Sequence, residues 1–122
     1  MGWNFSSYEP VYMQIVSRIR ADILAGRYAV DSPYPSVRLL AMDAAVNPNT
    51  MQRALTALES DGLLYSRGTA GRFVTADTAV LEEARRKAFA HEASAVISRA
   101  RALGMSKQEL LALIDQTEEW NI

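Results

Sequence analysis

The sequence predicts a mainly α-helical fold with one small β-hairpin. Apolar residues recur at helical spacing along most of the 122-residue chain. Two of the predicted helices are short and are joined by about four residues. After them, two β-leaning runs, LLYSR and RFVTA, flank the glycines of GTAG. We therefore expect an N-terminal winged helix-turn-helix over residues 1–76, followed by a C-terminal helical hairpin over residues 77–122.

The first helix is expected to begin near Pro10 and to end before Gly26, since Pro suits a helix start and Gly a helix end. Its apolar residues have the spacing i, i+3, i+4, i+7 and i+11 of one helix face: Tyr12, Ile15, Val16, Ile19 and Ile23. The next segment, RYAVDSPYPS, contains two prolines. It is predicted to be a loop with a short extended piece near Tyr34.

The second and third helices both carry start signals. Ser36 is placed to cap the second helix, whose apolar face comprises Val37, Leu40, Ala41 and Ala44. Asn47 is placed to cap the third, and Pro48 fits its first position, where a missing N–H costs nothing. The third helix has its own apolar stripe of Met51, Ala54, Leu55 and Leu58. Gly62 is expected to end it.

The rest of the chain is predicted to be a hairpin and two more helices. Gly68 and Gly71 are placed at the turn of the β-hairpin, which should pack on the helices because an isolated hairpin is marginally stable in water. A helical pattern resumes near Asp77 and ends at Gly104. The segment SKQE, which begins at Ser106, is a capping box for a short final helix.

The composition excludes several classes of function. Apolar residues make up 49% and charged residues 22% of the chain, as in ordinary globular proteins. No apolar run approaches the roughly 18 residues of a membrane span, and no secretory signal is visible. The chain has no Cys, one His (His91) and no Gly-rich phosphate loop. We expect a cytoplasmic protein with no membrane association, metal site, cofactor or enzymatic activity.

The charge is unevenly distributed between Arg and Lys. The net charge of −1 argues against a general polyanion binder. Residues 1–76 hold seven Arg and six acidic residues, a balance of +1, and no Lys. Arg suits planar, bidentate contacts with phosphate and guanine better than Lys does. This usage is compatible with selective contact to DNA.

The outward face of the third helix carries the candidate binding site. At about 100° per residue, Asn49, Arg53, Thr56 and Ser60 lie opposite the apolar stripe, with Gln52 on the flank. A solvated face usually presents Lys and Glu pairs. Asn, Gln and Arg can instead hydrogen-bond base edges in a major groove, and free N–H groups at the helix start can take a phosphate. The alternative is a plain solvated face with a good N-cap.

Three more arginines occupy positions that suit DNA contact. Arg67 and Arg72 flank the glycines of the hairpin, where a basic tip can reach the backbone or the minor groove. Arg38 lies in the first turn of the second helix, within reach of a phosphate. Each Arg taken singly is more often a solvated cation. Together with Arg53 in one small module, they favour DNA contact.

The stretch PSVRLLAMDAAVNPNTMQRALTALESDGLLYSRGTAGRFV resembles the winged-helix domain of GntR-family bacterial transcription regulators. PVYMQIVSRIRADILAGRY is similar to the family's first helix, and VNPNT with the short C-terminal region resembles the small YtrA-type branch. The resemblance is close over residues 10–75 and covers 77–122 only in length and helical pattern. It implies DNA contacts at Arg38, Asn47, Asn49, Thr50, Gln52, Arg53, Gly71 and Arg72.

The chain departs from the family pattern at several positions. Val30 and Asp31 replace a usual Pro-Gly, and Tyr34 replaces a Leu. Leu39 stands where the family has an acid, so the capping box that Ser36 would begin is lost. Ala45 replaces a Gly in the turn before the third helix. These changes leave the outward face of the third helix intact.

The resemblance also implies a homodimer through residues 77–122, which would place two recognition helices on a palindromic site about one DNA turn apart. The residues expected at this interface are apolar: Leu81, Phe89, Val96, Ile97, Leu103, Leu110, Leu113 and Ile114. Alternatively, this region folds back on its own winged helix. Trp120 could anchor the interface or cap a monomer core. Three of the five Met residues, Met42, Met51 and Met105, are expected to fill the core.

The predicted function is a sequence-specific DNA-binding transcription regulator, a repressor, that binds a palindromic operator as a homodimer. Its expected partners are double-stranded DNA and a second copy of itself. No effector is assigned. The alternative is a winged-helix module that binds protein and not DNA, which the net charge of −1 allows.

Overall fold

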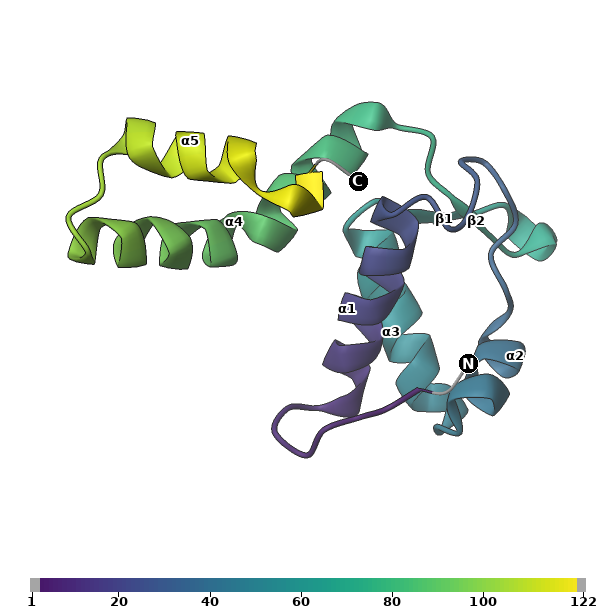
Figure 1. Ribbon diagram of the computed structural model, residues 1–122. Helices are drawn as coiled ribbons and strands as arrows, with labels where there is room; N and C mark the ends of the chain where they lie inside the picture. Colours follow the sequence, from purple (N-terminus) through teal and green to yellow (C-terminus); the bar gives the residue numbers. More distant parts are fainter. Residues whose placement is uncertain (1–2, 121–122) are drawn as a thin grey trace. The chain divides into compact units, whose positions relative to one another are not determined.

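The computed structural model describes residues 3–120, and its elements follow the predicted order (Figure 1). Helices α1 (Val11–Leu24), α2 (Val37–Ala44) and α3 (Pro48–Ser60) come first. A hairpin of β1 (Leu64–Ser66) and β2 (Arg72–Val74) follows, then α4 (Thr78–Ala102) and α5 (Lys107–Gln116). Short 3-10 helices cover Gly68–Ala70 and Glu118–Trp120. The predicted fold class, a winged helix-turn-helix followed by a helical hairpin, is confirmed.

The helix starts form where the sequence predicted them. The Leu39 N–H donates to Ser36 Oγ over 3.2 Å, and the Asn49 N–H donates to Asn47 Oδ1 over 2.7 Å. Ser106 and Glu109 form a complete capping box at α5. These caps satisfy backbone donors that a helix leaves unpaired at its start. Local polar signals therefore define where α2, α3 and α5 begin.

The turn between α2 and α3 has a left-handed residue that is not glycine. Ala45 has φ +55°, in the region where a Cβ crowds the following carbonyl. The sequence resemblance places a Gly here, and the structure shows why Gly would be favoured. Gly62, with φ +80°, follows α3 and directs the chain into β1.

The core of the winged helix lies between α1, α3 and the hairpin. Helix α1 runs beside α3 (Figure 1), and the buried apolar residues of both helices belong to one core cluster. The side chains with almost no exposed surface are Ile15, Ile19, Met51, Leu55, Leu58, Leu63, Leu64 and Val74. They come from elements far apart in sequence. This packing leaves the opposite face of α3 exposed.

The first turns of α4 pack on this same core. Val80, Leu81 and Ala84 are partly buried against it. The compact N-terminal unit accordingly extends to Ala84, past the predicted domain end at residue 76, and the second unit begins at Arg85. The assignment of DNA binding to residues 1–76 and of dimerisation to residues 77–122 stays a prediction.

The loop before α2 adds a short extended piece to the hairpin, as expected near Tyr34. The Asp31 N–H donates to the Val74 carbonyl and the Tyr34 N–H donates to the Arg72 carbonyl, both over 2.8 Å. The Tyr34 ring is buried, with its centroid 4.8 Å from that of Tyr28. Burial raises the pKa of the Tyr34 hydroxyl well above its usual value. The β1–β2 hairpin, which forms the wing of the winged helix, is thereby attached to the loop before α2 as well as to α3.

The N-terminal segment links α1 to α2. Trp3 Nε1 donates to the Asp43 carboxylate over 2.9 Å, and the Arg18 guanidinium lies over the Trp3 ring at 4.2 Å. Met42, next to Asp43, is 71% exposed, so the prediction that it fills the core is wrong. Only one face of the short α2 is covered, by way of Leu40, Ala41 and Ala44. Met51 is fully buried, as predicted.

The second unit buries little of its apolar surface. Ala100 is its one buried residue within the described part of the chain. His91 is exposed. Across residues 3–120 the structure has no helix with both the length and the apolar character to cross a membrane.

Candidate nucleic-acid interface

The outward face of α3 presents a row of exposed polar side chains. Asn49, Gln52, Arg53, Thr56 and Ser60 are all exposed, opposite the buried stripe of the same helix. Gln52 Nε2 lies 3.5 Å from Thr56 Oγ1, one turn along the helix. Such a loose contact leaves the Gln52 amide free to turn toward a ligand. The face can donate and accept hydrogen bonds along most of the helix.

Arg53 is oriented by a neighbour on another helix. Its guanidinium carbon lies 3.7 Å from the centroid of the Tyr12 ring, at the start of α1. Tyr12 is half-buried and Arg53 is exposed. This is a cation–π contact between α1 and the outward polar face of α3.

The start of α3 does not offer the free N–H groups that the sequence suggested for phosphate. Pro48 has none, and the Asn49 N–H is capped by the Asn47 side chain. The N–H groups of Thr50 and Met51 both donate to the Asn47 carbonyl, over 3.0 and 3.1 Å. These N–H groups are therefore already paired with Asn47, so the expectation of free donors is wrong, while phosphate contact at this end stays a prediction. Asn47 remains exposed and Thr50 is half-buried.

Arg72 of the wing is tied to α3. Its Nε donates to Glu59 Oε1, and its side chain keeps only 17% of its surface exposed. Ser66 Oγ also donates to the Glu59 carboxylate, over 3.2 Å. Glu59 therefore joins both strands of the wing to α3. In this arrangement Arg72 serves more as an anchor than as an outward donor.

Arg67 remains nearer the solvent. Its guanidinium lies 4.2 Å from the centroid of the Phe73 ring and donates to Tyr65 Oη over 2.6 Å. Tyr65 in turn donates to Asp31 Oδ1 over 2.5 Å, and this hydrogen bond raises the pKa of the Tyr65 hydroxyl. Half of the Arg67 side chain is exposed. The network holds Arg67 at the wing while leaving part of its guanidinium accessible.

The remaining predicted contacts lie at exposed positions. Arg38, in the first turn of α2, is exposed, and within residues 3–120 its side chain has no hydrogen-bond or ion-pair partner. Gly71 is exposed at the wing turn with φ +89°, a value that a side chain would strain. Its backbone can approach a ligand closely.

Three contributors to this surface were missed from the sequence. Tyr12 was assigned to the apolar face of α1, although its ring also supports Arg53. Glu59 and Asp31 organise the wing, yet their partners lie on other elements. A helical pattern carries no signal for contacts between separate elements. The apolar spacing placed Tyr12 only on the apolar face of the first helix.

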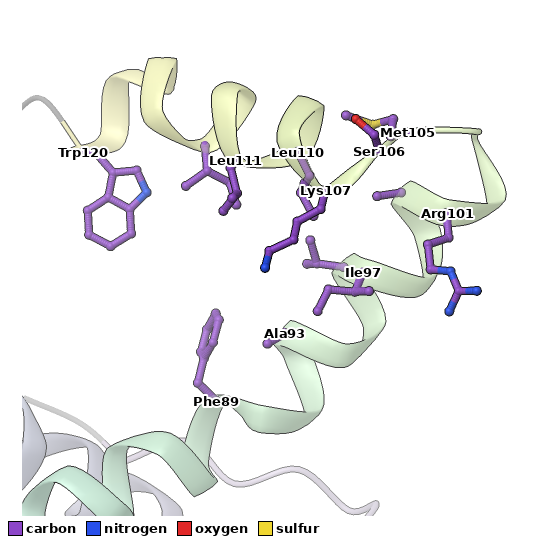
Figure 2. A pocket seen from close by; sticks show the side chains of 13 residues that line it. Phe89, Ala93, Ile97, Arg101, Met105, Ser106, Lys107, Leu110, Leu111 and Trp120 are labelled. Carbon is purple, nitrogen blue, oxygen red and sulfur yellow. The ribbon is translucent and has the colours of Figure 1, made fainter.

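The second unit has an apolar groove between α4 and α5 with a volume of about 780 Å³ (Figure 2). Phe89 and Trp120 face each other at one end, and Ile97 points toward α5 (Figure 2). Five of the predicted dimerisation residues line it: Phe89, Val96, Ile97, Leu110 and Ile114. Leu103 and Leu113 are exposed outside the lining, whereas Leu81 packs on the winged-helix core. An open groove of this kind leaves apolar surface uncovered within the second unit.

Residues 11–74 match the model of the family described as bacterial regulatory proteins, gntR family. The transcriptional regulator YhcF of Bacillus subtilis is 29% identical over 108 residues, which are 88% of this chain and 89% of YhcF. The repressor YtrA of Bacillus subtilis is 32% identical over 69 residues, covering 57% of this chain and 53% of YtrA.

Solved structures show the same likeness. A GntR-family transcriptional regulator from Listeria monocytogenes has a TM-score of 0.78 and 31% identity, with coverage of 93% of this chain and 99% of that one. The AraR DNA-binding domain in complex with operator ORX1 has a TM-score of 0.56 and 28% identity over 62% of this chain and 95% of that one. The family match spans more than half of the chain, and the relatives are regulators, not enzymes. The chain therefore belongs to the GntR family of bacterial transcription regulators.

Proposed function

We propose that this regulator is a repressor that binds a palindromic operator in the cytoplasm as a homodimer. The main support is the exposed polar face of α3. Asn49, Gln52 and Arg53 are residue types that read base edges in the major groove, and the opposite face of the helix is sealed in the core. AraR, a structural relative, is described in complex with an operator, and the relative YtrA is described as a repressor.

The other predicted contacts would position the reading face. Exposed Arg38 suits a phosphate near the start of α2, with Asn47, Thr50 and Thr56 beside the α3 contacts. On the wing, Arg67 has the more accessible guanidinium, and Gly71 allows close approach of the backbone. Arg72 would have to leave Glu59 to contact DNA directly. Its proposed role is to hold the wing at the angle that lets Arg67 reach the backbone.

The homodimer is supported by the exposed apolar surface of the second unit. Phe89, Val96 and Ile97 are each about half exposed or more, beside a groove of apolar lining. A second copy would cover this surface and would also duplicate the recognition helix. Two half-sites read together explain why a protein with net charge −1 can still bind one DNA sequence selectively. Leu81 is expected to contribute less, because it packs on the winged helix.

The DNA contact can be tested by selecting bound fragments from the host genome and titrating salt against the shortest duplex that binds. Affinity should fall steeply with salt, because each phosphate contact releases counterions. Replacing Arg53 with Ala should cost roughly 1–3 kcal/mol of affinity. Arg27→Ala is the matched control, since it removes the same charge from an exposed Arg that pairs with Asp22 at the end of α1.

Each part of the proposal has an outcome that would reject it. If no genomic fragment binds, the alternative of a protein-binding module gains support. An unchanged dissociation constant for Arg53→Ala, or an equal loss for Arg27→Ala, would show that α3 does not read bases as proposed. A reporter gene behind the selected fragment should be repressed by the wild-type chain. Increased expression would instead indicate an activator.

A further inference from the structure

The contact between Arg53 and Tyr12 brings α1 into the proposed recognition site. Tyr12 is the second residue of α1, and Arg53 lies in the second turn of α3. The guanidinium carbon is 3.7 Å from the centre of the phenol ring, which is van der Waals contact with the ring face. The two residues are far apart in sequence, so the packing of α1 along α3 creates the contact.

The stack orients Arg53 without using its hydrogen-bond donors. A ring face attracts the cation electrostatically but accepts no conventional hydrogen bond, so the N–H groups at the guanidinium edge remain available. Within residues 3–120, Arg53 has no hydrogen-bond or ion-pair partner. Arg67 and Arg72, by contrast, donate to Tyr65 and Glu59. Arg53 is thus held in place with its donors free.

Holding an arginine in one orientation favours binding. A free Arg side chain samples many rotamers and loses that freedom when it contacts a base. The Tyr12 ring restricts those rotamers before DNA arrives, because one face of the guanidinium is already covered. The edge-on donors are the ones that a guanine contacts in the bidentate geometry.

We propose that Tyr12 is a positioning residue for operator recognition, which holds the Arg53 guanidinium for base contact without touching DNA itself. This inference rests on the proposed function. It adds that part of the specificity is determined by a residue of α1, outside the helix-turn-helix. The alternative is that Tyr12 only fills space, since it is partly buried against the core.

A double-mutant cycle on the full chain separates these roles, with the duplex selected above as the probe. Tyr12→Phe keeps the ring and should change the affinity less than about twofold. Tyr12→Leu keeps apolar bulk but removes the ring, and should weaken binding about 3- to 10-fold. In the Arg53→Ala background, Tyr12→Leu should have almost no further effect, because its role acts through Arg53.

A second measurement reports the stack without DNA. The Hε proton of Arg53 should show an upfield ring-current shift in the NMR spectrum of the free protein. Tyr12→Phe should keep this shift and Tyr12→Leu should abolish it. Thermal unfolding of Tyr12→Leu checks that the fold is retained.

The outcomes distinguish the inference from the proposed function. If Arg53→Ala loses affinity while Tyr12→Leu loses none, or loses the same factor in both backgrounds, Tyr12 is not a positioning residue. If Arg53→Ala itself leaves affinity unchanged, the proposed base contact of Arg53 fails, and the role of Tyr12 fails with it. The base contact of Arg53 and the positioning role of Tyr12 are both supported if two results are found together. Tyr12→Leu should abolish the ring-current shift, and its loss of affinity should disappear in the Arg53→Ala background.

Discussion

The winged helix and the C-terminal helical hairpin contain similar apolar side chains but bury them to different extents. In the first unit, Leu55, Leu58 and Leu63 have no exposed surface. In the second unit, Phe89, Leu103 and Leu111 are each more than half exposed. Full burial of a Leu side chain contributes about 1.5–3 kcal/mol to folding. The first unit gains this stabilisation from a closed core, whereas the described part of the second unit gains little of it.

Local structure does not explain the difference. Helix α3 begins with an Asn47 cap, and α5 begins with a full Ser106 capping box. Both units therefore have well-defined helix starts. What the second unit lacks is a tertiary partner for its apolar groove. A helical hairpin can therefore have fully specified local structure and still depend on a further surface for stability.

The largest expected effect comes from removing the second unit. Deleting residues 85–122 should convert the proposed dimer into a folded monomer, because the core cluster lies in the first unit. Affinity for the palindromic duplex should fall about 10²- to 10⁴-fold, the usual gain from linking two binding modules. Light scattering would give the mass, and fluorescence anisotropy the affinity.

The truncated chain should end at Ala84 and not at residue 76. Val80, Leu81 and Ala84 cover the core, so the shorter deletion of 77–122 would expose it and should destabilise the domain. That shorter variant serves as the control for loss of fold. A truncated chain of residues 1–84 that keeps a dimeric mass would overturn the assignment of the interface to the second unit.

A matched pair of leucine substitutions tests the comparison one residue at a time. Leu55→Ala should lower the free energy of unfolding by about 2–5 kcal/mol, because it leaves a cavity in a closed core. Leu111 is 53% exposed, so Leu111→Ala should cost the monomer less than about 0.5 kcal/mol. Its effect should appear as weaker dimerisation. Urea denaturation at low protein concentration, together with mass measurements, would check both.

The comparison would fail if the two leucines behaved alike. Equal losses of monomer stability would mean that Leu111 is buried within the monomer. An unchanged dimer dissociation constant for Leu111→Ala would remove that residue from the interface.

Much of the fold could be predicted because its signals are local. A cap such as Ser36 or Asn47 acts on N–H groups two or three residues away, and a glycine such as Gly62 acts at its own φ. Apolar spacing likewise identified the buried face of α3, and so its exposed polar face. The candidate reading face follows directly from these short-range rules.

Contacts between separate elements could not be predicted in this way. Apolar spacing shows which face of a helix is apolar, but not what covers it. Met42 was therefore wrongly assigned to the core, and the packing of Leu81 on the winged-helix core was not foreseen. The Glu59–Arg72 pair depends on how the wing folds back on α3. The stack of Tyr12 on Arg53 likewise depends on the packing of α1. These contacts decide which arginines are available to DNA.

The smallest expected effect compares the caps of the two units. Asn47→Ala should lower the free energy of unfolding by about 1 kcal/mol, whereas Asn47→Ser should cost only a few tenths, because Ser also caps well. Ser106→Ala removes an equivalent cap from α5. Its cost should appear mainly in the dissociation of the dimer and so depend on protein concentration, since α5 is expected to be stable only when the groove is covered. Thermal unfolding over a hundredfold range of concentration would separate the two: a concentration-independent loss for Ser106→Ala would mean that the second unit is stable without a partner.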